Sequence, residues 1–211
     1  MAAETSSPAL LEDGPAGAGA VLVLAHGAGA PMDSPFMETV AQGLAAAGIR
    51  VARFEFPYMA ARRQGVRRGP DRPDVLLATW RAVVAALGGG ARLAIGGKSM
   101  GGRMASLLAD ELGAHGLVCL GYPFHPPGQP QRLRTAHLAD LRTPTLIVQG
   151  TRDPLGTTEE VASYTLSPAI RIEWIADGDH SLAPRRSSGR TPQQNLDAAI
   201  AAAATFVTGL P

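Results

Sequence analysis

From residue 20 onward, short apolar runs alternate with longer stretches in which apolar residues recur every three or four positions. A short apolar run predicts a buried strand, and the longer period predicts a helix with one apolar face. Their alternation is typical of βα units, in which helices cover both faces of a parallel sheet. The predicted strands are residues 20–25, 51–56, 92–95, 117–121, 145–149 and 170–175.

Four helices have recognisable start or stop signals. Ser, Thr or Asp commonly precedes the first helical turn, and glycine commonly follows the last one. These signals predict helices that begin at or after Ser34, Asp74 and Thr191 and end near Gly48, Gly88 and Gly209. A further helix is predicted after residue 99, with one apolar face made of Met104, Leu107, Leu108 and Leu112.

Length and composition indicate one folded domain. A chain of 211 residues fits a single hydrophobic core, because chains tend to divide into domains only beyond about 250 to 300 residues. Hydrophobic residues make up 45% of the chain and charged residues 18%, which is enough apolar surface to fold. Residues 1–19 are rich in Ala, Gly, Pro and Ser, so we expect a flexible leader or an edge strand there and a single domain over 20–211.

Charge, hydropathy and cysteine content argue against several classes of protein. The net charge of +1 is too small for a typical nucleic-acid binder. No apolar run approaches the roughly 20 residues of a membrane span, and the N-terminus lacks the basic segment of a signal peptide. The single cysteine, Cys119, excludes an internal disulfide and suits a reducing compartment, so we expect a cytoplasmic protein without membrane association.

The histidines do not predict a metal site. None of the five forms a close pair at metal-ligand spacing, and the chain has no cluster of cysteines. We therefore expect neither a metal nor another cofactor. The sequence contains no indication of the oligomeric state.

The most informative motif is Gly97-Lys98-Ser99-Met100-Gly101, a G-x-S-x-G pattern that joins a predicted strand to a predicted helix. The serine of such a motif lies at a sharp turn, where glycines two positions before and after it let strand and helix approach closely. The same residues resemble the end of a phosphate-binding P-loop, but that pattern requires a glycine where this chain has Arg92. We therefore interpret Ser99 as a nucleophile.

A candidate base and a candidate carboxylate follow later strands. His180 lies in the turn after strand 170–175, and Asp153 lies in the loop after strand 145–149. The order Ser, Asp, His is the order in α/β-hydrolases. Imidazole can take a hydroxyl proton near neutral pH, and a buried carboxylate orients the imidazole and stabilises its charged form. An aspartate before proline often only caps a turn and a loop histidine is often only solvated, but together the three predict a catalytic triad.

Acyl transfer also needs donors for the negative oxygen of the tetrahedral intermediate. The first predicted strand ends in a small-residue segment, His26-Gly27-Ala28-Gly29, that can turn sharply beside the nucleophile. We assign one donor to the N–H of Ala28, with Gly29 as the alternative, and the other to the N–H of Met100.

The surroundings of this site are predicted to be open. Only 22 residues lie between Gly121 and Pro144, and several are prolines, which leaves no room for a sizeable lid domain. Arginines at positions 62, 63, 67 and 68 fall in the loop after the second strand, where such a cluster is usually solvated surface, although one of them could face an acidic group on a substrate. The candidates for substrate contact are His26, Tyr122, His125, Arg62 and Arg63.

With these motifs in place, the chain resembles the small lidless α/β-hydrolases related to dienelactone hydrolase. It is similar in particular to predicted bacterial hydrolases that are related to testis-expressed proteins and to NSL regulatory subunits of chromatin complexes in animals. The resemblance covers roughly residues 20–208 and rests on segments 24–29, 97–103, 121–128 and 178–181. It implies an α/β-hydrolase fold with hydrolase machinery at Ser99, Asp153 and His180 and no cofactor. Dienelactone hydrolase has a cysteine nucleophile where this chain has serine, so lactone opening is not implied.

We therefore expect a carboxylesterase-like serine hydrolase that acts on a small acyl substrate through an acyl-enzyme intermediate. Thioesterase and peptidase activities remain alternatives. A different class of function, a non-catalytic binding or regulatory module on the same scaffold, is the main competing interpretation.

Overall fold

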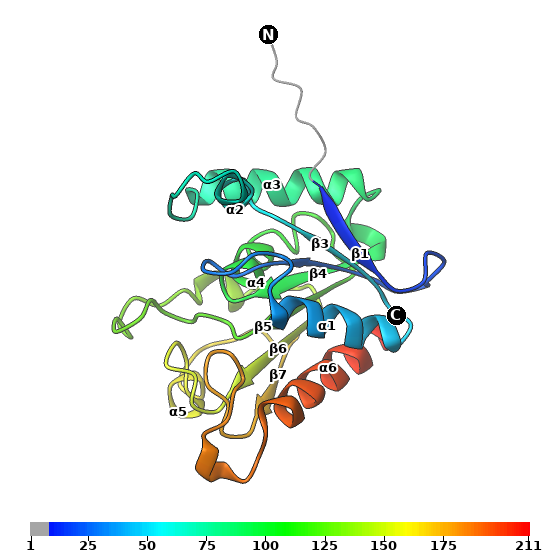
Figure 1. Cartoon of the computed structure of the whole chain (residues 1–211). Helices are drawn as coiled ribbons and strands as arrows, with labels where there is room; N and C mark the ends of the chain where they lie inside the picture. Colours follow the sequence, from blue (N-terminus) through cyan, green and yellow to red (C-terminus); the bar gives the residue numbers. More distant parts are fainter. Residues whose placement is uncertain (1–8) are drawn as a thin grey trace.

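A seven-stranded sheet runs through the computed structural model, which describes residues 9–211 (Figure 1). The strands lie in the order β1-β3-β2-β4-β5-β6-β7, and neighbouring strands are parallel except for β1, which pairs with β3 in the antiparallel direction. The strands are β1 (Leu10–Asp13), β2 (Val21–Ala25), β3 (Arg50–Phe54), β4 (Leu93–Lys98), β5 (Gly116–Leu120), β6 (Thr145–Gly150) and β7 (Ile170–Ile175).

The central strands are buried on both faces, which explains why their sequences are continuous apolar runs. Every residue of β5 and β6 is buried, and so are the first five residues of β4. Ile95 of β4 lies between Val23 of β2 and Leu117 of β5 in the parallel register. This register brings the carboxyl ends of the strands to one edge of the sheet.

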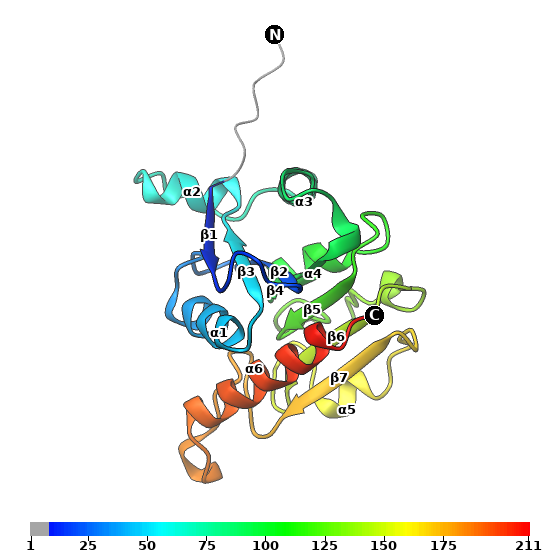
Figure 2. The same ribbon diagram turned by 90° about the vertical axis from the view of Figure 1, so that its right-hand side faces the viewer.

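Helices cover both faces of the sheet (Figure 2). α1 and α6 pack against one face, where their apolar residues form a core with β2 and β6. The residues of α3 and α4 contribute to the core on the opposite face, which also includes residues of α2 and α5. The helices are α1 (Pro35–Ala46), α2 (Pro57–Arg63), α3 (Pro73–Ala86), α4 (Met100–Ser106), α5 (Thr158–Val161) and α6 (Pro192–Thr208), with short 3-10 turns at Gly90–Arg92, Ala136–Leu138 and Arg186–Ser188.

Two of the predicted helix starts are confirmed, since Ser34 and Thr191 directly precede α1 and α6. Asp74 instead lies in the first turn of α3, which begins at Pro73 after Arg72. α1, α2, α3 and α6 each have proline in the first turn, where its fixed φ suits a helix and its missing N–H is not needed. At α6, the Thr191 hydroxyl accepts from the Gln194 amide while the Gln194 side chain accepts from the Thr191 amide, and the two bonds form a capping box.

The fold class predicted from the sequence is confirmed, and three local predictions are corrected. Arg62 and Arg63 lie in the last turn of α2 rather than in a loop. α4 ends at Ser106 because the chain then tightens into turns, with the amide of Leu108 bonded to the carbonyl of Ala105. Leu107 is consequently 36% exposed and does not continue the predicted apolar face.

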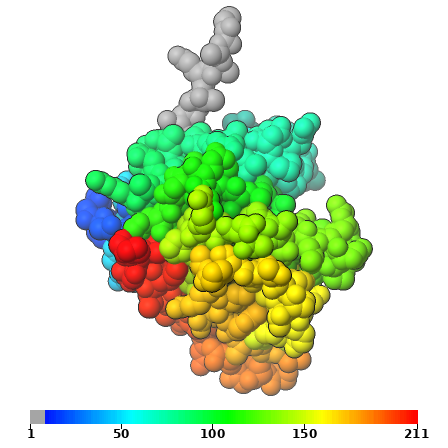
Figure 3. All heavy atoms as spheres, turned by 180° about the vertical axis from the view of Figure 1, so that it is seen from behind, coloured from blue at the N-terminus to red at the C-terminus, as the bar shows by residue number. Residues whose placement is uncertain are grey.

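Between β5 and β6 the described chain contains only the 3-10 turn Ala136–Leu138, so no lid domain covers this edge. Within residues 9–211 no helix is long and apolar enough to cross a bilayer. Seen from behind, the C-terminal end of the chain lies beside the turn that leads into β2 (Figure 3).

Candidate active site

Ser99 occupies the sharp turn between β4 and α4. Its backbone has φ 50° and ψ −113°, a conformation that non-glycine residues rarely adopt. The flanking glycines are required by space: a Cβ on Gly97 would lie 2.2 Å from the carbonyl oxygen of Ala25, and one on Gly101 would lie 2.4 Å from the same oxygen. The turn therefore presses against the end of β2, and the Ser99 amide is held by the carbonyl of Leu120 at 3.0 Å.

Three side chains from separate loops meet at this turn. The Nε2 atom of His180 lies 2.8 Å from the Oγ of Ser99, and its Nδ1 lies 2.8 Å from the Oδ2 of Asp153. The carboxylate of Asp153 is an acceptor, so Nδ1 carries the imidazole proton and Nε2 accepts the hydroxyl of Ser99. The hydrogen-bonded chain can thus pass the serine proton to the imidazole.

The carboxylate of Asp153 is completely buried and has three donors. Its Oδ1 accepts the amide of Leu155 at 2.9 Å, and its Oδ2 accepts both His180 and the side-chain amide of Gln149 at 2.9 Å. Gln149 is itself buried at the end of β6 and also bonds the backbone of Tyr122. Satisfied in this way, the carboxylate is fixed in the orientation that binds the imidazole.

A network of backbone bonds shapes the turn that carries His180. The Oδ1 atom of Asp179 accepts the amides of Ser181 at 2.7 Å and Ala183 at 3.0 Å. The amide of Arg152 donates to the carbonyl of Gly178 at 2.9 Å, which joins the start of the turn to the loop after β6. The turn is therefore a defined structure and not a loose surface loop.

A pocket of about 430 Å³ opens in front of Ser99 and His180. Ala28 and Gly29, whose amides are the two alternatives predicted for one oxyanion donor, lie in its lining, and Met100 directly follows the serine. Among residues 9–211, the amides of Ala28 and Met100 have no hydrogen-bond acceptor. The lining residues are Gly27, Ala28, Gly29, Ala30, Ser34, Phe36, Met37, Lys98, Ser99, His180 and Ser181.

Three residues expected to contact a substrate are instead buried in the structure. His26 is fully buried, with Nδ1 bonded to the carbonyl of Gly27 and Nε2 accepting the amide of Phe56. Burial lowers the pKa of His26, in agreement with a neutral ring that holds two strand ends together. Tyr122 donates its hydroxyl to the carbonyl of Arg134, and His125 is 2% exposed. None of these three lines the pocket in this structure, and substrate contact by them stays a prediction.

The two arginines proposed to face a substrate acid have protein partners. Arg63 binds the carboxylate of Glu55 through two nitrogens at 2.7 Å each and also reaches Asp33 at 2.7 Å. Arg62 donates to the carbonyl of Arg68 and lies over the ring of Tyr58. Neither arginine lines the pocket, and a substrate contact by either of them stays a prediction.

Lys98 and Gln149 are site residues that the sequence reasoning missed. Gln149 supports Asp153, but an apolar strand that ends in glutamine carries no distinct signal. Lys98 lines the pocket, and burial lowers the pKa of its amine to about 8. A signal for Lys98 did exist, because it is the only lysine in a chain whose other 18 Lys or Arg residues are all arginine.

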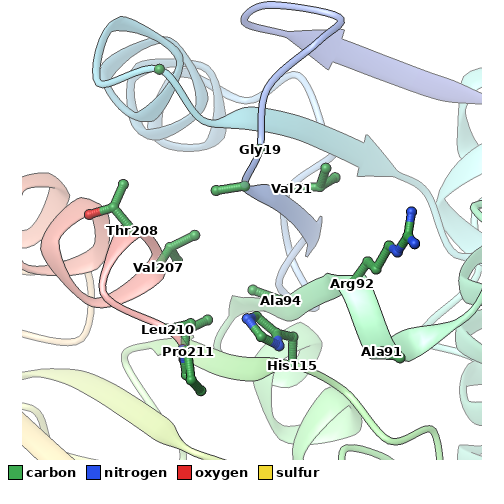
Figure 4. A pocket seen from close by; sticks show the side chains of 12 residues that line it. Gly19, Val21, Ala91, Arg92, Ala94, His115, Val207, Thr208, Leu210 and Pro211 are labelled. Atoms are coloured by element: carbon green, nitrogen blue, oxygen red, sulfur yellow. The ribbon is translucent and has the colours of Figure 1, made fainter.

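A second hollow, of about 500 Å³, lies at the opposite edge of the sheet (Figure 4). The starts of β2 and β4 and the C-terminal residues line it, with His115 and Arg92 as its charged or titratable side chains. It contains none of the three residues that meet at Ser99. Within residues 9–211 no group of three or more His, Cys, Asp or Glu side chains is placed to hold a metal ion.

Comparison with known proteins agrees with this fold. Residues 18–208 match the family model described as alpha/beta hydrolase domain. The structure is similar to dienelactone hydrolase from Anabaena variabilis, with a TM-score of 0.71 and 21% identity over 95% of this chain and 91% of the other. It is also similar to a serine hydrolase without lid from Xanthomonas campestris, with a TM-score of 0.66 and 19% identity over 96% and 90%. Est1E from Butyrivibrio proteoclasticus, solved with ferulic acid bound, gives a TM-score of 0.69 and 14% identity over 95% of each chain.

Proposed function

The chain belongs to the alpha/beta hydrolase domain family, and on that premise we propose that it is a serine hydrolase that cleaves a carboxylic ester through an acyl-enzyme on Ser99. The observation that carries the proposal is the continuous path from Ser99 Oγ to His180 Nε2 and from His180 Nδ1 to Asp153, with both distances at 2.8 Å. The similarity to dienelactone hydrolase and lidless serine hydrolases supports it. The further relationship to testis-expressed and chromatin-complex proteins stays a prediction.

In the proposed first half-reaction, the Oγ of Ser99 attacks the ester carbonyl carbon while its proton moves to His180 Nε2. The tetrahedral intermediate then collapses, and the imidazolium gives the proton to the departing alcohol oxygen. In the second half-reaction, water attacks the acyl-enzyme with the same imidazole as base, and Ser99 is released with a carboxylic acid. Asp153 holds the imidazole in the tautomer that both halves need.

The amides of Ala28 and Met100 are proposed to stabilise the negative oxygen of each intermediate. Each such donor typically contributes about 3 kcal/mol of transition-state stabilisation. Their support is the free amide of each residue beside Ser99 and the presence of Ala28 in the pocket lining. Gly29 stays the alternative donor.

The pocket favours a small ester over a peptide. It holds about 430 Å³, and its lining between Gly27 and Met37 is mostly apolar or small. Because no lid covers this edge, the proposed substrate enters directly from solvent. Est1E binds ferulic acid, so an aromatic ester belongs in the first substrate panel beside short and medium aliphatic esters.

Labelling with a fluorophosphonate tests the proposal, because this reagent bonds covalently to an activated serine. We expect the folded wild-type protein to be labelled and Ser99→Ala to resist. Ser181→Ala is the matched control, since Ser181 lines the same pocket outside the hydrogen-bonded path, and it should retain labelling. Resistance of the folded wild-type protein would instead favour a non-catalytic binding module. A panel of matched esters, thioesters and amides then separates esterase, thioesterase and peptidase activity.

A further inference from the structure

The single lysine of the chain lies beside the candidate base. Lys98 is the last residue of β4, directly before Ser99, and its Nζ donates a hydrogen bond to the main-chain carbonyl of His180. The contact joins residues 82 positions apart. It therefore connects the strand that carries the nucleophile to the turn that carries the imidazole.

The surrounding backbone leaves space for this contact. Gly121, at the end of β5, has φ +68°, and a Cβ there would lie 2.8 Å from the Lys98 Nζ and 2.9 Å from the His180 carbonyl oxygen. Any larger residue at Gly121 would collide with both partners. The ammonium and the carbonyl thus meet in a space bounded by the ends of β4 and β5 and the His180 turn.

The choice of lysine over arginine fits this narrow space. The chain has arginine at 18 positions, and its one lysine is Lys98. An ammonium is a compact donor on an unbranched stem, whereas a guanidinium is a planar fork with five N–H groups. The compact ammonium suits the space beside Gly121, where a Cβ would already lie 2.8 Å from Nζ.

No carboxylate lies within ion-pair distance of the Lys98 ammonium among residues 9–211. Burial lowers its pKa to about 8, and the more distant charges of Asp153 and Asp179 oppose that decrease. A part-buried cation without a paired anion loses hydration, and here only the His180 carbonyl and the Phe36 ring, whose centroid lies 5.6 Å from Nζ, offset that loss.

We propose that Lys98 is a positioning residue for His180: its hydrogen bond to the main-chain carbonyl places the imidazole within reach of Ser99 and Asp153. The inference rests on the proposed serine hydrolase function. Hydrogen bonds accepted by the Asp179 side chain shape the turn that carries His180. The Arg152 amide joins this turn to the loop after β6, and Lys98 joins the turn to β4. A misplacement of about 1 Å in such a site can reduce the rate 100-fold.

The first test replaces the lysine. In Lys98→Met we expect kcat to fall about 10- to 100-fold on the preferred ester, with KM changed less than about threefold, because the pocket keeps its volume while the base is displaced. Lys98→Arg keeps the charge but should not restore kcat, since a guanidinium is larger than the ammonium and cannot present one compact donor to the same carbonyl. Wild-type kcat in Lys98→Met would overturn the inference.

Chemical rescue separates positioning from general damage. Lys98→Cys alkylated with bromoethylamine carries an ammonium at the reach of lysine, and alkylation with iodoacetamide places a neutral amide at the same reach. The native thiol at Cys119 is 1% exposed and its pKa is strongly raised by burial, so it should not react in the folded protein. We expect aminoethylation to restore kcat to within about threefold of wild type and the neutral amide to restore part of it. Failure of aminoethylation to raise kcat would refute the positioning role.

A spectroscopic measurement keeps this inference distinct from the proposed function. The Nδ1 proton between His180 and Asp153 should give a downfield NMR signal in the wild type that is lost or exchange-broadened in Lys98→Met and returns on aminoethylation of Lys98→Cys. If the wild type shows this pattern yet hydrolyses no ester and resists fluorophosphonate, the serine hydrolase proposal fails while the positioning role stands. If esters are hydrolysed and the signal is the same in Lys98→Met, the positioning role fails alone.

Discussion

The free-energy cost of the turn at Ser99, between β4 and α4, can be measured by substitution of this residue. With φ 50° and ψ −113°, this residue holds a conformation that glycine adopts freely and other residues do not. Ser99→Gly and Ser99→Ala both remove the hydroxyl and its bond to His180. They differ mainly in whether the new residue accepts the strained backbone, so their difference in stability isolates that strain.

The expected difference follows from two opposing terms. Sparsely populated backbone conformations cost roughly 1 to 3 kcal/mol. Glycine in turn loses about 0.5 to 1 kcal/mol through the greater freedom of its unfolded chain. We therefore expect Ser99→Gly to be about 1 kcal/mol more stable than Ser99→Ala, which corresponds to a Tm about 2 to 4 °C higher for a domain of this size.

Urea and thermal unfolding of the two variants, followed by circular dichroism, provide the measurement. Ser181 supplies the control, because its φ is not among the positive values found in the described chain. There the order should reverse, with Ser181→Gly less stable than Ser181→Ala by about 0.5 to 1 kcal/mol. Equal stability of Ser99→Gly and Ser99→Ala, or a less stable glycine variant, would refute the argument that the turn is strained.

Two further predictions concern stability around the site. Burial lowers the pKa of Lys98 from 10.5 to about 8, so the folded protein binds this proton more weakly than the unfolded chain, and the charged amine costs about 3 kcal/mol. Even with its hydrogen bond lost, Lys98→Met should be about 2 kcal/mol more stable than wild type at pH 7. Urea unfolding should show this gain in stability shrinking between pH 8 and 10.5, as the wild-type amine loses its proton in the folded state. A gain that is independent of pH would contradict the lowered pKa of Lys98. A Cβ on Gly96 would lie 1.9 Å from the carbonyl oxygen of Val118 in the neighbouring strand. Gly96→Ala should therefore destabilise the protein by about 3 kcal/mol in urea unfolding. The control Gly69→Ala, with open space around it, should change stability by less than about 0.5 kcal/mol.

The sheet was predictable because burial on both faces leaves a simple signal. Six apolar runs correspond to β2 through β7, with no end more than three residues away from its predicted position. The short elements were less accessible: α2 has seven residues and α5 has four, too few for a helical period to repeat. α4 was predicted too long because the apolar residues after Ser106 continue into turns that keep part of the helical spacing.

The meeting of Ser99, Asp153 and His180 was predictable from topology alone. Each follows the carboxyl end of a parallel strand, and those ends share one edge of the sheet. Substrate contact at His26 and Tyr122 stays a prediction, because no observation tests it. His26 and Tyr122 are adjacent to the site in sequence, but their polar atoms are used to satisfy backbone groups, which a sequence motif does not reveal.

The two residues that sequence reasoning missed are Lys98 and Gln149. Lys98 bonds a main-chain carbonyl of the site, and Gln149 bonds the side chain of another site residue. Lys98 reaches a main-chain carbonyl 82 residues away, and main-chain partners leave no pattern of residue types. Gln149 is indistinguishable in sequence from any polar residue at a strand end, although its amide orients Asp153. Composition offered the one usable signal. The chain has arginine at 18 positions and lysine at only one, which indicates that position 98 has a specific requirement for lysine.

The costs to stability in this fold concentrate at the edge of the sheet that carries the proposed chemistry. Ser99 has a strained backbone, Lys98 is a part-buried cation without a paired anion, and Asp153 is a fully buried carboxylate. Each breaks a local rule of stability, and each is placed where acyl transfer needs a nucleophile, a positioned base or an orienting acid. If function maintains these costs, Lys98→Met should gain stability as it loses activity, and Ser99→Gly should be more stable than Ser99→Ala while both are inactive, whereas Gly96→Ala, which breaks only packing, should lose stability and activity together.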